Sequence, residues 1–263
     1  MRKSIRTSGK PAKIYILLVL LFMYLPVILL VIYSFNDSKT SVWAGFTVDW
    51  YKRLFQNVQI RDALWTSARL ALYSCMSAAI IGTLGAFGMT RSHFRGKGML
   101  ENTALFPIMI PEIIIALAYL VFFARVGIPF GMKALVLAHT TFCIPYVYIN
   151  VKSRLAGMDA SIQEAALDLG ASKGRMFLDI VVPLVMPAIL SGSLLALAMS
   201  LDDVIISLFL TDATTNTLPI RIYSMMKTGV TPEINALCTV LLVAVLIAFG
   251  VFSIVRAQTK KRV

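Results

Sequence analysis

Residues 14–35, IYILLVLLFMYLPVILLVIYSF, form an apolar run that contains no charged residue. A bilayer core of about 30 Å is crossed by roughly 20 apolar residues in helical form, so this run is long enough to span it. Basic residues precede the run, as in a signal peptide. The run is, however, longer than a cleavable apolar region and lacks an exit of the A-x-A type. We therefore expect residues 14–35 to remain in the protein as a transmembrane helix.

The composition of the whole chain agrees with a membrane protein. Of its 263 residues, 58% are hydrophobic and 14% are charged, and the mean hydropathy is +0.80. Soluble domains carry about 25% charged residues, so soluble enzymes and disordered chains are excluded. The net charge of +12 is not arranged as a basic stripe with interleaved aromatic residues, so it does not predict nucleic-acid binding. Excess Lys and Arg in a membrane protein more often determine topology.

Six apolar stretches predict an all-α membrane protein with six transmembrane helices. They cover residues 14–35, 64–90, 103–123, 133–151, 187–210 and 235–256. If the N-terminus lies inside the cell, the inner segments hold roughly twice as many Lys and Arg as the outer ones, and this bias places both termini in the cytoplasm. The expected organisation is then a basic tail at 1–13, the first helix at 14–35, a periplasmic loop at 36–63, a five-helix core at 64–256 and a second basic tail at 257–263.

The polar residues of the chain do not form a recognisable catalytic or metal site. Cys75, Cys143 and Cys238 lie far apart in apolar stretches, and His93 and His139 are equally isolated in the sequence. We expect no disulfide, no metal and no catalytic residue, because none of these groups has the required spacing. A Walker A string, which would cradle a nucleotide phosphate, does not occur. Any ATP and Mg²⁺ would therefore be bound by another polypeptide.

The longest inner loop, at about 152–186, contains the most specific motif. Ser161 and Glu164 have the spacing of a capping box, so a helix is predicted to begin at Ser161, with Gly170 as its left-handed end. Ile162, Ala165, Ala166 and Leu169 would share one face of this helix. Ser172 is expected to cap a second helix that ends near Pro183 and Pro187. By itself, the pattern fits either a helical hairpin that only links two spans or a docking site for a partner.

The string from Glu164 to Pro183 resembles the EAA loop of permease subunits in ABC importers, whose pattern is E-A-A-x3-G-x9-I-x-L-P. The chain departs from it only at Val182, where leucine is usual. The resemblance implies the type I ABC importer permease fold and a short helix that sits in a groove of a cytoplasmic ATPase subunit. The residues implied to couple to the ATPase are Glu164, Ala165, Ala166, Leu169 and Gly170. Glu164 would anchor the helix, the two alanines would allow close approach, and Gly170 would set the angle between the two helices.

Four charged residues lie well inside the predicted spans, namely Arg69, Glu112, Asp202 and Asp203. Buried charges are costly and are usually paired, so Arg69 is expected to form a structural ion pair with one of the aspartates. Adjacent residues on a helix point about 100° apart, so the other aspartate can face an aqueous path. Glu112 either lines that path or is protonated by desolvation. We interpret Glu112, Asp202 and Asp203 as a substrate path that suits a cationic solute.

Further strings resemble the polyamine branch of the same permease family. They are Ser34–Asn36, Trp43–Thr47, Ala138–Cys143, Ser200–Val204 and Pro232–Leu237. The resemblance implies an importer of spermidine or putrescine in a bacterial inner membrane. Its implied partners are a second permease subunit, related but different, an ATPase dimer and a periplasmic polyamine-binding protein. The alternatives are an importer of another cationic or amino-acid-like solute and, less favoured, a channel or a membrane enzyme.

Overall fold

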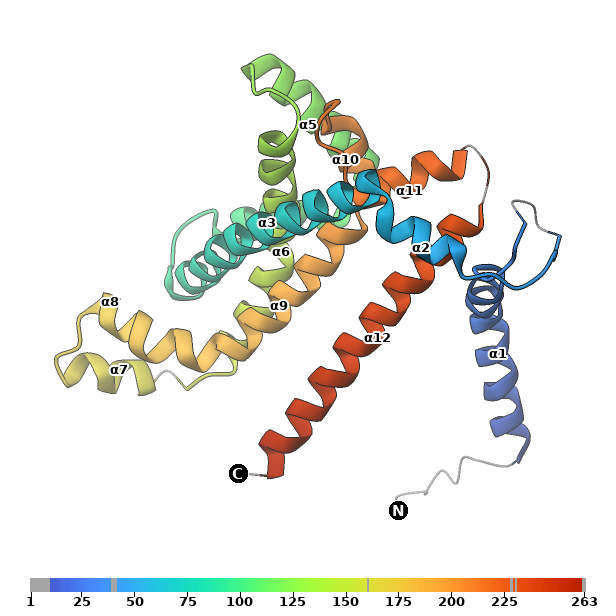
Figure 1. Cartoon of the computed structure of the whole chain (residues 1–263). Coiled ribbons are helices and arrows are strands. Elements are labelled where there is room, and N and C mark those ends of the chain that lie inside the picture. The colour runs from blue at the N-terminus through green and yellow to red at the C-terminus, as the bar shows by residue number, and fades with distance from the viewer. Residues whose placement is uncertain (1–9, 39–41, 160, 228, 230, 262–263) are drawn as a thin grey trace. The chain divides into compact units, whose positions relative to one another are not determined.

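The computed structural model describes residues 10–38, 42–159, 161–227, 229 and 231–261, and divides the chain into two compact units (Figure 1). The first unit contains the residues up to 58 and from 224 onward, and the second contains residues 59–223. Apart from an isolated bridge between Asn36 and Phe46, the regular elements of the described residues are helices, as the sequence predicts.

The first unit consists of α1 (Lys10–Tyr33), α2 (Asp49–Gln56) and α12 (Pro232–Lys261), and both α1 and α2 contact α12. The segment that joins α1 to α2 folds around the buried side chain of Asn36. Asn36 Nδ2 donates to the carbonyl oxygen of Val42 over 2.9 Å, and its Oδ1 accepts from the Ala44 N–H over 2.8 Å. The Trp50 indole N–H donates to the Asn36 carbonyl oxygen over 2.8 Å. The predicted outer loop at 36–63 is therefore partly ordered by specific hydrogen bonds.

The second unit contains the remaining helices, and α11 crosses the division between the units. They are α3 (Val58–Arg91), α4 (Lys97–Met109), α5 (Glu112–Val126), α6 (Met132–Ala156), α7 (Ser161–Asp168), α8 (Lys173–Arg175), η1 (Met176–Val181), α9 (Val182–Asp202), α10 (Ile205–Leu210) and α11 (Leu218–Lys227).

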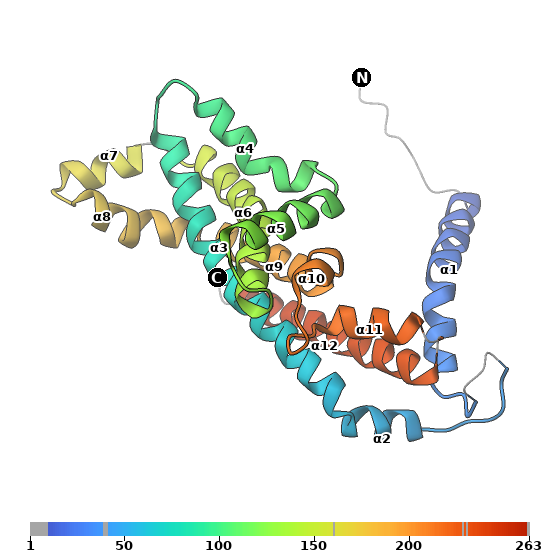
Figure 2. The same cartoon turned by 90° about the horizontal axis from the view of Figure 1, so that it is seen from above.

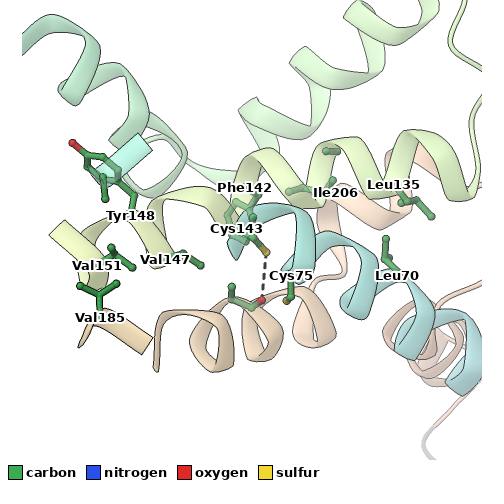
Figure 3. Packing of buried hydrophobic residues seen from close by; sticks show 14 of the residues in the cluster. Leu70, Cys75, Leu135, Phe142, Cys143, Val147, Tyr148, Val151, Val185 and Ile206 are labelled. Carbon is green, nitrogen blue, oxygen red and sulfur yellow. Dashed lines mark hydrogen bonds between the residues drawn. The ribbon is translucent and has the colours of Figure 1, made fainter. Parts of the chain in front are cut away.

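The core of the second unit forms around α6, whose Cys143, Val147 and Val151 are fully buried (Figure 3). Helix α9 packs along α6, and at Gly192 the two backbones are so close that an added Cβ would lie 2.8 Å from the Val147 Cα atom. Helix α3 approaches α6 in the same way at Gly82, where an added Cβ would lie 3.0 Å from Val147 Cβ. Membrane helices commonly pack through small residues, because hydrocarbon chains outside the protein are as apolar as its core.

Among the described residues, four helical stretches are long and apolar enough to cross a bilayer, namely Pro11–Tyr33, Val58–Arg91, Met132–Ala156 and Lys173–Asp202. Helices α4 and α5 together would make a fifth crossing with a sharp bend. The sixth predicted span lies on α12, in which the described apolar part Pro232–Ala248 is shorter. Six crossings with both termini in the cytoplasm therefore stay a prediction.

Two of the predicted continuous spans are broken in the structure, which corrects the sequence interpretation. The third span bends by 107° between α4 and α5. Figure 2 shows that these two helices run in clearly different directions. Pro111 has no N–H to donate and restricts Ile110 to an extended backbone (φ −88°, ψ 137°), so α4 cannot continue. The fifth span is broken at Asp203, whose backbone is also extended (φ −64°, ψ 125°).

The opposite correction applies after the EAA loop, where the second helix does not end near Pro183 and Pro187. Instead, α8, η1 and α9 form one continuous helical stretch from Lys173 to Asp202. The six-residue π-helical segment η1 ends at Val181, two residues before Pro183. A proline ring clashes with the carbonyl group four residues earlier, here that of Asp179, and the wider π turn accommodates this group.

Candidate functional site

The two helix breaks bring together the three carboxylates that the sequence analysis assigned to a path. Glu112 is the first residue of α5, Asp202 is the last residue of α9, and Asp203 follows at the second break. The Glu112 side chain lies close enough to Asp203 for a side-chain interaction and also within range of the Asp202 charge. Broken helices that meet in this way are typical of substrate sites in membrane transporters.

Asp203 is buried and uses both of its carboxylate oxygens within the chain. Oδ1 accepts a hydrogen bond from the Ile206 N–H over 3.1 Å, and Oδ2 accepts one from the Ser207 N–H over 2.8 Å. The N–H groups in the first turn of a helix have no acceptor within the helix itself. By accepting from two of them, Asp203 caps α10. The carboxylate stabilises the break between α9 and α10.

His139 on α6 completes this network. Its ring is fully buried, and Nε2 lies 3.3 Å from Asp203 Oδ2 and 3.2 Å from Ser207 Oγ. On the other side of the ring, Nδ1 lies 2.9 Å from Ser200 Oγ. His139 is isolated in the sequence, so it was absent from the predicted site. A signal was present, because His139 lies inside a predicted span, where an ionisable residue indicates a functional or structural partner.

Arg69 does not form the predicted pair with an aspartate within the described part of the chain. It lies exposed on α3, and its Nε donates to the carbonyl oxygen of Trp65 over 3.3 Å. Asp203 is paired with His139 instead. Similar depth along two helices does not determine such a pair, because the direction in which Arg69 points is set by helix packing.

The remaining two carboxylates are accessible from outside the chain. Asp202 is exposed and Glu112 is partly exposed, whereas Asp203 is 4% exposed. A ligand can therefore reach Asp202 and Glu112 without breaking the hydrogen bonds that cap α10. This arrangement can attract a cation, with Asp203 and His139 as its rigid support.

The predicted second site, the EAA loop, folds into a hairpin of α7 and α8 at one end of the second unit (Figures 1 and 2). Helix α7 begins at Ser161 as predicted, but Asp159 supports its start, because Asp159 Oδ1 accepts from the Ser161 N–H over 3.0 Å. This hydrogen bond lowers the pKa of Asp159 and keeps its carboxylate ionised. Gly170 ends the helix with φ +88°, and Ser172 Oγ accepts from the Arg175 N–H over 3.3 Å, both as predicted.

Helix α7 and the residue after it, Leu169, present apolar side chains that the described part of the chain leaves exposed. Leu169 is 88% exposed, Ile162 is 41% exposed, and Glu164 and Ala165 are also exposed. Ala166 lies one turn after Ile162 on α7, but it is buried, as is Gln163. The coupling residues named from the sequence therefore divide into an outward group and an inward Ala166.

The chain is similar to known proteins over most of its length. Residues 78–262 match the family model "Binding-protein-dependent transport system inner membrane component". The chain is 42% identical to the spermidine/putrescine transport system permease protein PotC of Haemophilus influenzae over 87% of this chain and 90% of that protein. It is 40% identical to the putrescine transport system permease protein PotI of Escherichia coli K12 over 96% of this chain and 94% of that protein.

A solved structure shares the fold. It is a crystal structure of a bacterial ABC transporter involved in the import of the acidic polysaccharide alginate, with a TM-score of 0.76 and 15% identity. The match covers 96% of this chain and 98% of the solved chain. At this identity the likeness concerns the fold alone.

Proposed function

The chain belongs to the family of binding-protein-dependent inner-membrane transport components, and we propose that it is a permease subunit of an ATP-driven importer for the polyamines spermidine and putrescine. The observation that carries the substrate class is the similarity to PotC and PotI, which extends over most of the chain at 40–42% identity. The chain is not an enzyme, and its proposed share of the work is to form half of the translocation path.

The proposed coupling to ATP hydrolysis is through α7. Its outward face combines Leu169 and Ile162 with the small Ala165 and the carboxylate of Glu164, and such a face can enter a groove of an ATPase subunit. Gly170 directs the chain from α7 into α8 and so into the continuous helix that includes α9. ATP and Mg²⁺ belong to the partner ATPase in this proposal.

For the path, we place Glu112 and Asp202 against the ammonium groups of the solute. Both are carboxylates that lie near each other at the two helix breaks and are not fully buried. Asp203 stabilises the break between α9 and α10, since its two carboxylate oxygens already accept hydrogen bonds from α10. This division of roles refines the expectation that all three carboxylates line the path.

The proposed assembly contains a second permease subunit that is a related but different chain, an ATPase dimer and a periplasmic polyamine-binding protein. The proposed location is a bacterial inner membrane with both termini in the cytoplasm. The excess of basic residues in the inner segments supports this orientation.

The test is uptake of labelled putrescine and spermidine by cells that lack only this subunit, with and without the restored chain. We expect ATP-dependent uptake to return with the chain and to remain lost with Glu164→Lys, although this variant should still insert into the membrane. Restored uptake of a labelled amino acid in place of both polyamines would overturn the substrate class. Recovery of the chain without an ATPase subunit after mild solubilisation would favour a channel.

A further inference from the structure

One cluster of side chains joins the last turn of α3 to α7 and to η1, the segment that continues from α8. Arg91, the last residue of α3, donates from Nη2 to Gln163 Oε1 on α7. The Arg91 guanidinium also lies over the Phe87 ring, 5.5 Å from its centroid. Phe87 in turn contacts Phe177 of η1, with the ring centroids 4.6 Å apart.

The contact with Arg91 and the outward face of α7 lie on different sides of this short helix. Gln163 is 8% exposed, whereas its neighbours Glu164 and Ala165 are exposed. A partner that binds the outward face therefore leaves Gln163 bound to Arg91. Any displacement of α7 by that partner acts on Arg91 through this hydrogen bond.

Beyond Arg91, described contacts continue to the helix break at Asp203. Helix α3 meets α6 at Gly82, where an added Cβ would lie 3.0 Å from Val147 Cβ. Helix α6 also carries His139, whose ring lies against Asp203. The end of α3 at Arg91 is thus connected through packed helices to the carboxylate cluster.

We propose that Arg91 and Gln163 are positioning residues that transmit the movement of α7 to α3 during transport. The inference rests on the proposed function, because it assumes that a partner ATPase moves α7. A hydrogen bond to a charged group is stronger than a neutral one, and a direct side-chain contact transmits displacement when both partners sit on rigid helices. Contact between the hairpin and the membrane helices is therefore not limited to the covalent connection through η1 and α9.

The experiment uses the complete transporter, reconstituted in proteoliposomes, with ATP hydrolysis and putrescine uptake measured in the same preparation. We expect Gln163→Ala and Arg91→Ala each to lower the putrescine transported per ATP by at least about five-fold, the lower range of typical coupling between sites. The double variant should be no worse than either single one, because both remove the same contact. Gln163→Glu keeps an acceptor for Arg91 and should retain coupling, and Arg95→Ala, which changes an exposed neighbouring arginine, is the matched control.

Each other result has a definite meaning. Gln163→Ala with the wild-type ratio of uptake to ATP hydrolysis would overturn the inference and leave the proposed function intact. Loss of the ATPase subunit on purification of Gln163→Ala, but not of Arg95→Ala, would also overturn it, since the contact would then serve docking only. Absence of ATP-dependent uptake of either polyamine by the wild-type transporter would instead overturn the proposed function.

Discussion

Asp202 and Asp203 are adjacent in the sequence, yet the structure assigns them different tasks. Asp203 accepts hydrogen bonds from the N–H groups of Ile206 and Ser207 and lies beside His139. Asp202 is exposed at the end of α9. The difference follows from the helix break, which turns one carboxylate toward the buried first turn of α10 and leaves the other outside.

We predict that Asp203→Ala lowers the free energy of unfolding by about 3 kcal/mol or more. It removes the cap of α10 and leaves His139 without its carboxylate in a buried place. Thermal unfolding of the detergent-solubilised chain measures this effect. Asp202→Asn is the control for stability and should unfold like the wild type, while its putrescine uptake falls by about ten-fold. An equal loss of stability in both variants would contradict the assignment.

Gly170 provides a second test at the level of one residue. Its φ of +88° costs other residues about 1–2 kcal/mol, and no atom lies within 4 Å of an added Cβ, so the cost of Gly170→Ala is confined to the backbone. We predict that Gly170→Ala reorients α7 and lowers uptake per ATP in the reconstituted transporter. Gly174→Ala is the matched control, because Gly174 also has free space but lies in helix α8. Equal coupling in both variants would show that the angle at Gly170 is unimportant.

At Gly192, the backbones of α6 and α9 lie closer together than those of α3 and α6 do at Gly82. An added Cβ at Gly192 would lie 2.8 Å from the Val147 Cα atom and 3.1 Å from the Tyr146 carbonyl oxygen, which are backbone atoms that cannot rotate away. We predict that Gly192→Ala separates these helices and destabilises the protein by about 1–3 kcal/mol. The loss is measured as a lower unfolding temperature. Gly88→Ala on α3, where nothing lies within 4 Å of an added Cβ, should unfold like the wild type.

The helix breaks show which boundaries local sequence can predict. Ser161 and Gly170 bound α7 as expected, because capping and a left-handed end depend on neighbours only a few residues away. The positions of the prolines did not predict where the membrane helices end. Pro111 ends α4, whereas Pro183 and Pro187 lie inside one continuous helical stretch, and Pro145 lies inside α6. The effect of a proline in a membrane helix depends on whether surrounding structure accommodates the freed carbonyl group, as the π turn η1 does before Pro183.

For the complete transporter, the proposal predicts which side of α7 the ATPase contacts. A photoreactive cross-linker attached to a cysteine at position 169 should capture the ATPase subunit, because Leu169 is 88% exposed. The same probe at position 166 is the control, since Ala166 is 7% exposed and faces the chain itself. Cross-links from position 169 to lipid alone in an actively transporting complex would contradict docking through α7.

The sequence by itself was enough to predict a helical membrane protein, the family and the limits of the helix from Ser161 to Asp168. Apolar runs, caps and a motif of fixed spacing are local features, and they act in the same way whatever the rest of the chain does. Only the tertiary structure decided that Asp203 is paired with His139 and not with Arg69, and that two spans are broken. His139 and Ser200 are separated by 61 positions in the sequence, and the directions of their side chains depend on how α6 and α9 pack. Buried polar groups must find partners, but helix packing determines which partners are within reach.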